Sequence, residues 1–478
     1  ENFQDDVVTI NGAEWLTNWE PHKNGIYKAY FPEHLVDENL NYTQLFWNGK
    51  YMEPARYPDE DQDKLSSLEW TPTQTLESGN NQGNVLFSES FPANYWKGGY
   101  YIGANGANKN EMFSAPKGRI IASSGNTIEC TDICWNWDNN WPSTVGTGRG
   151  FVIHHLNALN SEGEWTYQND TVYFYPPSGE ILTDTNAEIR TKLWAIDMSG
   201  SHDITLRGLH VKAGSIDMAD TENCAIDSCT VIYPTPLSTY HIHPYGIKAN
   251  GSLGIYVSGN NNTITNTYIG KGWSALITIE GENNLLENCV IEDGMWLRER
   301  GGLVNCYGIG NTLRKNTIRF SGVLGISGGN TKWIDNYGVE YLLEFNHIYE
   351  TNHLSCGGAF YTNHKGNFNP HANAVIRYNW ISTGYKGTPF GTSIHGIYLD
   401  DGSSGFLIHH NVVYNSKYGF RTNQDNLDVK YFNNSVVYCR NSHGRWVIPE
   451  PTEILVYNNT GTSPYQGTDN QHNAYIDT

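Results

Sequence analysis

A short motif that contains an asparagine recurs along the C-terminal part of the chain. The motif reads apolar-x-apolar, then Asn, then x-apolar, as in LRKNTI (313–318) and LEFNHI (343–348). Its asparagines recur every 22 to 33 residues, at Asn266, Asn288, Asn316, Asn346, Asn379, Asn411, Asn434 and Asn459. Such a period with variable insertions is typical of a solenoid in which each coil stacks on the next. We therefore predict a right-handed parallel β-helix, with these asparagines in one line along its axis.

Three coils, which end at Asn346, Asn379 and Asn411, are longer than the others. Insertions in a solenoid fall between the stacked strands and become turn loops on one side. We expect the loops of these three coils to enclose a substrate groove.

The N-terminal part lacks this repeat but has strand-like runs separated by turn residues. Asn48-Gly49 and Asn169-Asp170 each lie between apolar stretches, which is the pattern of a tight β-hairpin. The expected fold class is therefore all-β. We predict that residues 1–195 form a β-rich barrel or sandwich with the start of the solenoid, and that residues 196–478 form the β-helix that carries the groove. Because a β-helix must protect its open end, the N-terminal region is suited to cover it.

The charge of the chain excludes some partners. It has 30 Lys and Arg against 50 Asp and Glu, a net charge of −20, which repels a phosphate backbone and argues against nucleic-acid binding. No apolar run of about 18 residues is present, so we expect no membrane span. The chain starts at Glu1 without a methionine, which suggests either that the sequence has been trimmed or that a signal peptide has been removed, and with the latter we expect a secreted, periplasmic or cell-surface location.

Several segments point to a known group of enzymes. They are LFWNGK (45–50), ARYP (55–58), GEW (163–165) with VYFYP (172–176), ITLRGL (204–209) and HGIYLDDGSS (395–404). Together they resemble secreted parallel-β-helix glycoside hydrolases with an associated β-barrel domain. This broad group includes β-xylosidase, α-1,3-galactosidase, α-fucosidase-like and endo-fucanase families. The resemblance implies a polysaccharide substrate and hydrolysis of its glycosidic bonds by carboxyl groups.

Asp400 is the principal catalytic candidate. Alternation along Ile397–Asp400 points Ile397 and Leu399 inward, hence Tyr398 and Asp400 outward. Aligning neighbouring coils by their glycines gives two outward columns: Ser327, Phe360, Tyr398 and Arg421, and Gly329, Thr362, Asp400 and Asn423. Asp400 is then a lone carboxylate among aromatic and polar groups, a composition that suits a sugar.

A glycosidase commonly needs a second carboxyl group. Asp401 is adjacent to Asp400 but faces the other way on a strand, and Asp400-Asp401-Gly402 also fits an Asx turn or a calcium site. Glu350 is the nearest candidate by coil position. The alternatives are Glu344, Asp335, Asp425 and Glu280.

Histidines and cations near these acids are candidates for substrate binding. His353, His364 and His395 can donate to sugar hydroxyls or to a sulfate, or act as a base. Arg298, Arg300, Lys386 and Arg421 can hold an anionic substituent, which raises the idea of a sulfated, fucose- or galactose-containing polysaccharide.

Two other functions remain open from the sequence. The first is a polysaccharide lyase, in which Lys386 or His364 would act as the base and Arg421 would neutralise the charge of a uronate. The second is a solenoid that binds carbohydrate without catalysis. Neither HExxH nor a paired CxxC occurs, so we expect neither a metal site nor a cofactor, with calcium the one alternative. Cys130 with Cys134, and Cys224 with Cys229, are candidates for local disulfides.

Overall fold

The structure is a computed structural model. It describes residues 6–32, 36–37, 40–41, 44–59, 64–65, 70–79, 82–108, 111–114, 116–131, 146–178, 181–237, 254–297, 301–329, 340–354, 357–363, 373–384, 394–400, 402–423, 426, 428–446, 454–457, 459–461, 463, 469–471 and 473–475. These residues form β-strands with one short 3-10 helix, η2 (Leu156–Ala158). The all-β fold class is confirmed.

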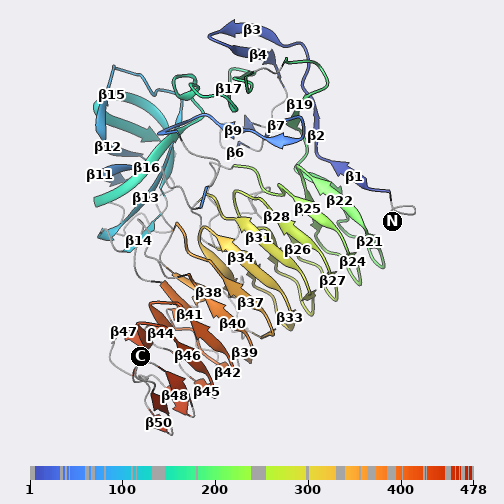
Figure 1. The fold of residues 1–478 in the computed structure, drawn as a ribbon, viewed down its shortest axis with the longest axis vertical. Helices are drawn as coiled ribbons and strands as arrows, with labels where there is room; N and C mark the ends of the chain where they lie inside the picture. The colour runs from blue at the N-terminus through green and yellow to red at the C-terminus, as the bar shows by residue number, and fades with distance from the viewer. Residues whose placement is uncertain are drawn as a thin grey trace.

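The C-terminal part is a right-handed parallel β-helix built of three sheets, which each coil visits in the same order (Figure 1). The first sheet contains β20 (Trp194–Asp197), β23 (Ser215–Met218), β26 (Ile255–Val257), β29 (Ile277–Ile279), β32 (Gly302–Cys306), β35 (Leu324–Gly328), β38 (Gly357–Asn363), β41 (Ile394–Asp400), β44 (Tyr418–Asn423) and β47 (Asn441–Trp446). The second contains β21 (Thr205–Arg207), β24 (Ala225–Asp227), β27 (Thr263–Thr265), β30 (Leu285–Glu287), β33 (Asn311–Arg314), β36 (Tyr341–Glu344), β39 (Ala374–Arg377), β42 (Phe406–His409), β45 (Val429–Phe432), β48 (Ile454–Tyr457) and β50 (Asp469–Gln471). The third contains β1 (Val8–Asn11), β22 (Leu209–Lys212), β25 (Thr230–Ile232), β28 (Tyr268–Gly270), β31 (Val290–Gly294), β34 (Thr317–Ser321), β37 (His347–Tyr349), β40 (Trp380–Ser382), β43 (Val412–Tyr414), β46 (Ser435–Val437), β49 (Thr460–Gly461) and β51 (Ala474–Tyr475).

The solenoid core is a stack of aliphatic side chains, one layer per coil. In the first sheet, Ile277, Val304 and Ile326 occupy one inward position of successive strands and are fully buried. Phe360 and Ile397 continue that column. Burying an apolar side chain of this size stabilises the fold by about 1.5–3 kcal/mol, and each layer is enclosed by the layers above and below. The repeated apolar positions of the motif therefore determine which residues form the strands of each coil.

The asparagine ladder is confirmed from Asn316 onward. Each asparagine at the turn between the second and third sheets accepts a hydrogen bond, on its side-chain oxygen, from the backbone of the preceding coil. Asn316 N, for example, donates to Asn346 Oδ1 at 3.0 Å, and Asn346 Nδ2 donates to Leu313 O at 2.9 Å. The row runs through buried Asn379, Asn411, Asn434 and Asn459 to Asn473.

The prediction is wrong by one position for Asn266 and Asn288. In these two coils the buried ladder position is taken by Thr267 and Cys289, and Cys289 N donates to Asn316 Oδ1 at 3.0 Å. Asn266 and Asn288 lie one residue earlier, exposed and with φ of +51° and +54°. Asparagine tolerates this left-handed conformation, which explains its presence at the neighbouring position.

The N-terminal region contains a closed antiparallel barrel. Its strands pair in the ring β16–β11–β12–β15–β13–β16, where β11 is Thr71–Gly79, β12 Gln82–Phe91, β13 Tyr100–Asn108, β15 Lys117–Thr131 and β16 Gly146–Ile153. At its margins lie β10 (Arg56–Tyr57) and β14 (Glu111–Ser114). Figure 1 shows the barrel against the side of the solenoid, away from the end where β21 and β22 lie.

Two smaller sheets, one mixed and one antiparallel, complete this region with a two-stranded ribbon. They are β3 (Glu20–Lys23), β4 (Ile26–Tyr30), β18 (Thr171–Phe174), β17 (Glu164–Gln168) and β9 (Glu53–Pro54); β2 (Ala13–Trp15), β19 (Ala187–Arg190), β7 (Leu45–Trp47) and β8 (Lys50–Tyr51); and β5 (Val36–Asp37) with β6 (Leu40–Asn41). The first of these sheets is mixed because β9 pairs with β17 in parallel. Both predicted hairpins are confirmed. Asn48-Gly49 joins β7 to β8 and Asn169-Asp170 joins β17 to β18, all four residues with positive φ, as a type I′ turn requires.

Aromatic side chains connect the N-terminal region to the solenoid. Trp273 Nε1 donates to Tyr51 Oη at 2.8 Å, and Trp296 packs against both rings. The Lys64 ammonium lies 4.9 Å from the centre of the Trp273 ring and forms an ion pair with Glu53. Because these contacts bury a cation among aromatic rings, they fix the two regions against each other.

The predicted Cys224–Cys229 disulfide is wrong, because both residues are buried free thiols whose sulfurs contact backbone carbonyl oxygens. Cys130 is also a buried free thiol, and Cys134 lies outside the described residues. Burial raises the pKa of the Cys289 thiol to about 12. Among the described residues, no helix is long and apolar enough to cross a bilayer.

Candidate functional site

Asp400 is the last residue of β41, on the outward face of the first sheet. Its two carboxylate oxygens accept hydrogen bonds from side chains of both neighbouring strands. Tyr361 Oη of β38 donates to Oδ2 at 2.9 Å, and Asn423 Nδ2 of β44 donates to Oδ1 at 2.5 Å. The neighbouring coils therefore hold the Asp400 carboxylate in one orientation, half-buried and facing outward.

The register of β38 corrects the predicted outward columns. Gly358 pairs with His395, not with Gly396, so the residues beside Tyr398 and Asp400 are Tyr361 and Asn363. Phe360 and Thr362, which the glycine alignment placed there, point into the core and are fully buried. A slip of one residue reverses the face of every side chain on a strand, so the site has one more tyrosine than predicted.

Tyr398 and Tyr361 form an aromatic pair next to the carboxylate. Their ring centres are 5.3 Å apart at an interplanar angle of 77°. Burial, followed by the negative charge of Asp400, raises the pKa of Tyr398 well above its ordinary value of 10. Tyr398 therefore keeps its proton at neutral pH and serves as a hydrogen-bond donor.

His395 lies on the same strand and is almost completely buried. Its ring contacts Tyr398 and Tyr418, with ring centres 4.7 and 5.2 Å apart. Burial, and then the positive charges of Arg421 and Lys417, hold the pKa of His395 well below 6.5. The imidazole is therefore neutral, which suits it to a role in packing and orienting Tyr398.

Arg421 supplies the positive charge of the site. It pairs in register with Tyr398 on the outward face, and its guanidinium carbon lies 5.3 Å from the centre of the Tyr418 ring. Arg421, Tyr398 and Asp400 thus form one cluster across β41 and β44, as the sequence analysis predicted.

Glu350 and His353 lie at the other end of the first sheet. They belong to the turn that enters β38, where Glu350 O accepts from Ser321 N at 3.1 Å, and their side chains are 3.7 Å apart. The seven residues of β38 span about 20 Å, and Asp400 lies at the exit of the next strand. The structure therefore does not bring Glu350 and Asp400 together.

Two alternative acids are placed elsewhere. Glu344 is a buried residue of the second sheet, in an ion pair with Arg377 at 2.7 Å. Glu280 follows β29 in the first sheet, four strands before β41, and accepts a hydrogen bond from Tyr256 at 2.7 Å. Four strand spacings amount to about 19 Å, too far for a glycosidase pair with Asp400.

Several of the predicted site residues lie outside the described residues. These are Asp401, His364, Lys386, Arg298, Arg300, Asp335 and Asp425. Within the described strands β32 to β47, Asp400 is the only carboxylate of the first sheet. Among the described residues, no group of three or more His, Cys, Asp or Glu could hold a metal ion.

Comparisons with known proteins agree with the fold. The family model described as "Right handed beta helix region" matches residues 194–387. A solved structure named "Glycoside hydrolase" is similar over 95% of this chain and 83% of its own, with 14% sequence identity and a TM-score of 0.50. At this identity the likeness concerns the fold.

Two further structures are similar at lower scores. An alpha-1,3-glucanase from Streptomyces thermodiastaticus strain HF3-3 has 9% identity and a TM-score of 0.30, with 91% of this chain and 98% of its own covered. A tailspike protein of E. coli bacteriophage HK620, in complex with a pentasaccharide, has 15% identity and a TM-score of 0.31, with 57% of this chain and 44% of its own covered. No curated protein sequence matches the chain.

Proposed function

We propose that the chain is a glycoside hydrolase that cleaves a polysaccharide on the outward face of the first sheet, with Asp400 as a catalytic carboxyl group. The observation that carries this proposal is the surroundings of Asp400. An outward carboxylate is fixed by Tyr361 and Asn423 and bordered by Tyr398 and Arg421. Tyrosine rings pack on the C–H faces of sugars, while hydroxyl, amide and guanidinium groups bond to sugar hydroxyls.

The hydrogen bonds suggest which role Asp400 takes. Both of its oxygens accept, so in this arrangement it has the form of a nucleophile or general base rather than of a proton donor. The second carboxyl group then supplies the proton. We propose Asp425 or Asp335 for that role, with Asp401 as a further candidate. Asp425 follows Asn423, the partner of Asp400, by two residues, whereas Glu350 lies at the opposite end of the first sheet.

A lyase is less well supported by the described residues. β-Elimination needs a base that removes a proton from the sugar, and tyrosine serves only when its pKa is lowered. Here burial and Asp400 raise the pKa of Tyr398. His395 is neutral, as a general base must be, but it is only 2% exposed and so is poorly placed to reach a sugar. The site therefore favours hydrolysis or binding over elimination.

The substrate proposed in finer detail is a sulfated polysaccharide that contains fucose or galactose. It is supported by Arg421 on the outward face and by the three basic residues outside the described part of the chain, Arg298, Arg300 and Lys386. Since such polymers are extracellular, we also propose a secreted, periplasmic or cell-surface location.

Product analysis after incubation with neutral, sulfated and uronate-containing polysaccharides tests this proposal. Hydrolysis gives new reducing ends without ultraviolet absorbance, whereas a lyase gives unsaturated products that absorb. We expect fragments without absorbance from the native chain and none from Asp400→Asn. Absorbing products would establish the lyase. Binding of a polysaccharide without any fragments from either protein would establish the non-catalytic solenoid.

A further inference from the structure

A row of exposed aromatic rings runs along the solenoid away from Asp400. Phe345, Tyr378 and His410 occupy the same turn position, just before the ladder asparagine, in three successive coils. The Phe345 and Tyr378 rings stack with centres 5.2 Å apart and planes within 7°, and the Tyr378 and His410 rings are 5.0 Å apart. Phe345 is 53% exposed and Tyr378 40% exposed. We call these three residues the aromatic row.

The backbone at these positions disfavours aromatic residues. Phe345, Tyr378 and His410 have φ between +55° and +57°, in the left-handed region. Four earlier coils fill the same position with residues that are small or tolerate this region, Gly208, Ser228, Asn266 and Asn288, and the coil directly before Phe345 has Lys315 there. A bulky residue there costs about 1 kcal/mol or more relative to glycine or asparagine. Three consecutive rings held against this cost, and exposed to water, indicate a surface that contacts a ligand.

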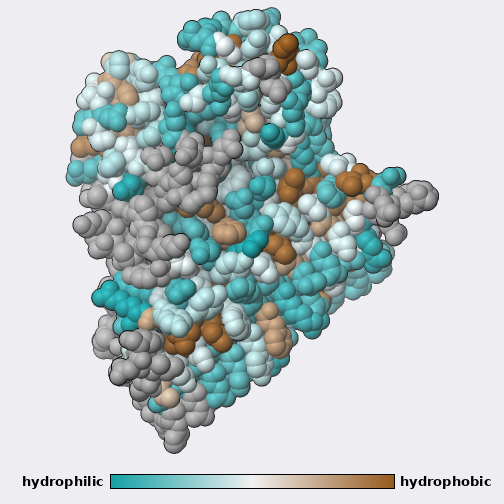
Figure 2. All heavy atoms as spheres, in the orientation of Figure 1, coloured by the Kyte–Doolittle hydropathy of each residue, from teal (hydrophilic) through white to brown (hydrophobic). Residues whose placement is uncertain are grey.

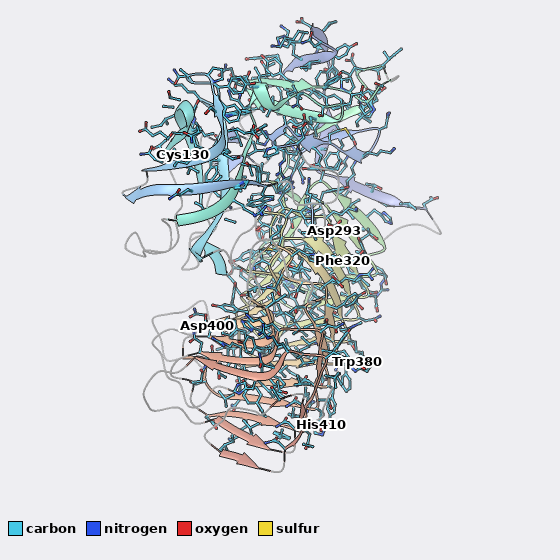
Figure 3. All side chains as sticks on the ribbon, turned by 60° about the vertical axis from the view of Figure 1, so that its left-hand side comes forward. Cys130, Asp293, Phe320, Trp380, Asp400 and His410 are labelled. Atoms are coloured by element: carbon cyan, nitrogen blue, oxygen red, sulfur yellow. The ribbon has the colours of Figure 1, made fainter. Side chains whose placement is uncertain are left out.

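More rings lie next to the aromatic row, on the outward face of the third sheet. His347 stacks on Tyr349 with ring centres 4.3 Å apart, and its Nε2 is 3.0 Å from Tyr414 Oη. Trp380 is 58% exposed, and its ring centre lies 6.4 Å from that of Tyr414. Phe320 packs against Tyr349. Figure 3 shows Phe320, Trp380 and His410 on one flank of the solenoid and Asp400 on the other.

The charges on this face are already paired within the protein. Arg319 forms an ion pair with Glu292, and Arg377 forms one with Glu344. The surface is also not a continuous apolar face, because Figure 2 shows small hydrophobic patches on the solenoid separated by hydrophilic residues. Flat rings, polar edges and internally compensated charges fit the C–H faces and hydroxyls of sugar rings better than a lipid.

A groove extends the aromatic row toward the N-terminal end of the solenoid. It is lined by Thr265, Asn266, Glu287, Asn288 and Lys315. Asn266, Asn288 and Lys315 occupy the turn position of the aromatic row in the three preceding coils. Coils repeat at about 4.8 Å, so one ligand chain lying along the axis would meet two amides, then Lys315 in its ion pair with Glu287, and then one ring per coil.

We infer that the aromatic row, with the neighbouring rings of the third sheet, is a second polysaccharide-binding surface, separate from the Asp400 site. Its ligand is a stretch of glycan chain laid along the solenoid axis and held through sugar ring faces. The inference deepens the proposed function, on which its choice of a polysaccharide rests. The surface would keep a long substrate on the enzyme while Asp400 acts on another part of that substrate or on a neighbouring chain.

The test is affinity electrophoresis in gels that contain xylan, galactan or a sulfated fucan. The variant is Phe345→Asn with Tyr378→Asn, which installs the residue that the chain itself uses at this position in earlier coils. The control is Tyr438→Asn, since Tyr438 is also an aromatic with positive φ, 76% exposed, but lies in the turn from the third sheet to the first. We expect at least one polysaccharide to retard the native chain, and the double variant to bind it about tenfold more weakly. Tyr438→Asn should be retarded like the native chain, and the part of the retardation that the double variant loses should not change with salt.

Equal retardation of the double variant and the native chain would overturn the inference, and so would retardation of neither by any of the three polysaccharides. A second copy of the chain as occupant would also overturn it, and sedimentation would reveal that as a dimer which the double variant fails to form. A melting curve checks that the double variant is folded. Hydrolysis without binding at this surface leaves the Asp400 proposal standing, and binding without hydrolysis leaves only the surface standing, so the two failures are distinguishable.

Discussion

The first and third sheets of the solenoid both carry aromatic residues on their outward faces, but they hold them differently. On the first sheet, Tyr361 and Tyr398 surround a carboxylate, and Tyr361 donates to it at 2.9 Å. On the third sheet, Trp380 is 58% exposed, and Phe345 at the adjoining turn is 53% exposed. The same scaffold therefore presents rings that position a reactive group on one flank and rings that offer open contact area on the other.

Electrostatics separate the two faces in the same way. The first sheet places Asp400, Arg421 and a neutral His395 in one half-buried cluster, where charges shift the pKa values of their neighbours. The third sheet pairs Arg319 with Glu292 at its surface. Perturbed pKa values around an outward carboxylate are typical of sites that perform chemistry, whereas on the third-sheet face burial lowers the pKa of His347 beside an arginine that is already paired with a glutamate. The comparison predicts that substitutions on the two faces have separable effects.

The largest expected effect comes from Asp400→Asn. This change is isosteric, so folding and glycan binding should persist, while turnover should fall by at least about 100-fold because a catalytic carboxylate is lost. The measurement is turnover beside a melting curve, with Phe345→Asn/Tyr378→Asn as the control from the other face. That control should retain turnover of short oligosaccharides. A stable Asp400→Asn that remains active would move the chemistry to Asp425, Asp335 or Asp401.

Low pH should lower the stability of the fold through His395 on the first sheet. Its pKa is lowered in the folded state, so the unfolded chain binds the proton more readily below pH 6.5. The stability that this residue contributes is complete above pH 6.5 and declines as the pH falls below it. Melting temperatures at pH 7 and pH 5 measure the decline. It should be smaller in His395→Phe, and an equal decline in both proteins would show that His395 is not responsible.

Tyr361→Phe should remove one of the two donors to Asp400 while leaving the ring in place. A hydrogen bond to a charged group contributes about 1.5–3 kcal/mol, part of which water restores in a half-exposed site. We expect turnover to fall about tenfold with little change in melting temperature. Steady-state kinetics should show the loss in kcat rather than in KM. A change confined to KM would assign Tyr361 to substrate binding alone.

Salt should distinguish the two faces if the substrate is anionic. Attraction between Arg421 and a sulfate is screened over about 10 Å at 0.1 M salt, so KM should rise a few-fold between 0.05 and 0.5 M as an order-of-magnitude expectation. Arg421→Gln should remove most of this salt dependence. A KM that does not respond to salt in the native chain, or a neutral glycan as the sole substrate, would remove the sulfate proposal.

The solenoid could be predicted from the sequence because the residues that determine it recur at regular intervals. Each coil repeats the same apolar positions and turn, so the motif around Asn316 or Asn346 reports the stacking directly. The predicted asparagine ladder was wrong at Asn288, because the neighbouring Cys289 occupies the buried ladder position. A thiol and a threonine hydroxyl also occupy this position, and a motif defined by asparagine alone cannot reveal that substitution.

The site was harder to predict because its residues come from different coils. Asp400, Tyr398 and Arg421 were found by alternation along single strands, which is a local property. Tyr361 was missed because the alignment matched Gly358 to Gly396, whereas Gly358 pairs with His395 and neither glycine of β38 stands opposite Gly396. The apolar Phe360 could have set the register, since only its inward placement continues the column of Ile326. The aromatic row had no sequence signal beyond three bulky residues before successive asparagines.

The smallest expected effect is on stability, and it tests whether the left-handed backbone at Phe345 costs the fold free energy. Phe345 adopts a φ of +57° and leaves half of its ring in water, so Phe345→Asn should raise the free energy of unfolding by about 0.5–1 kcal/mol. Loss of the stacked contact with Tyr378 opposes this gain, which keeps the net effect small. Denaturant unfolding of the native chain and of Phe345→Asn measures it, and Asn433→Phe, the reverse change at an equivalent turn with φ of +54°, should lower stability by a similar amount. If Phe345→Asn instead destabilises the chain by more than about 1 kcal/mol, the ring is a structural support, and its exposure no longer argues for a ligand.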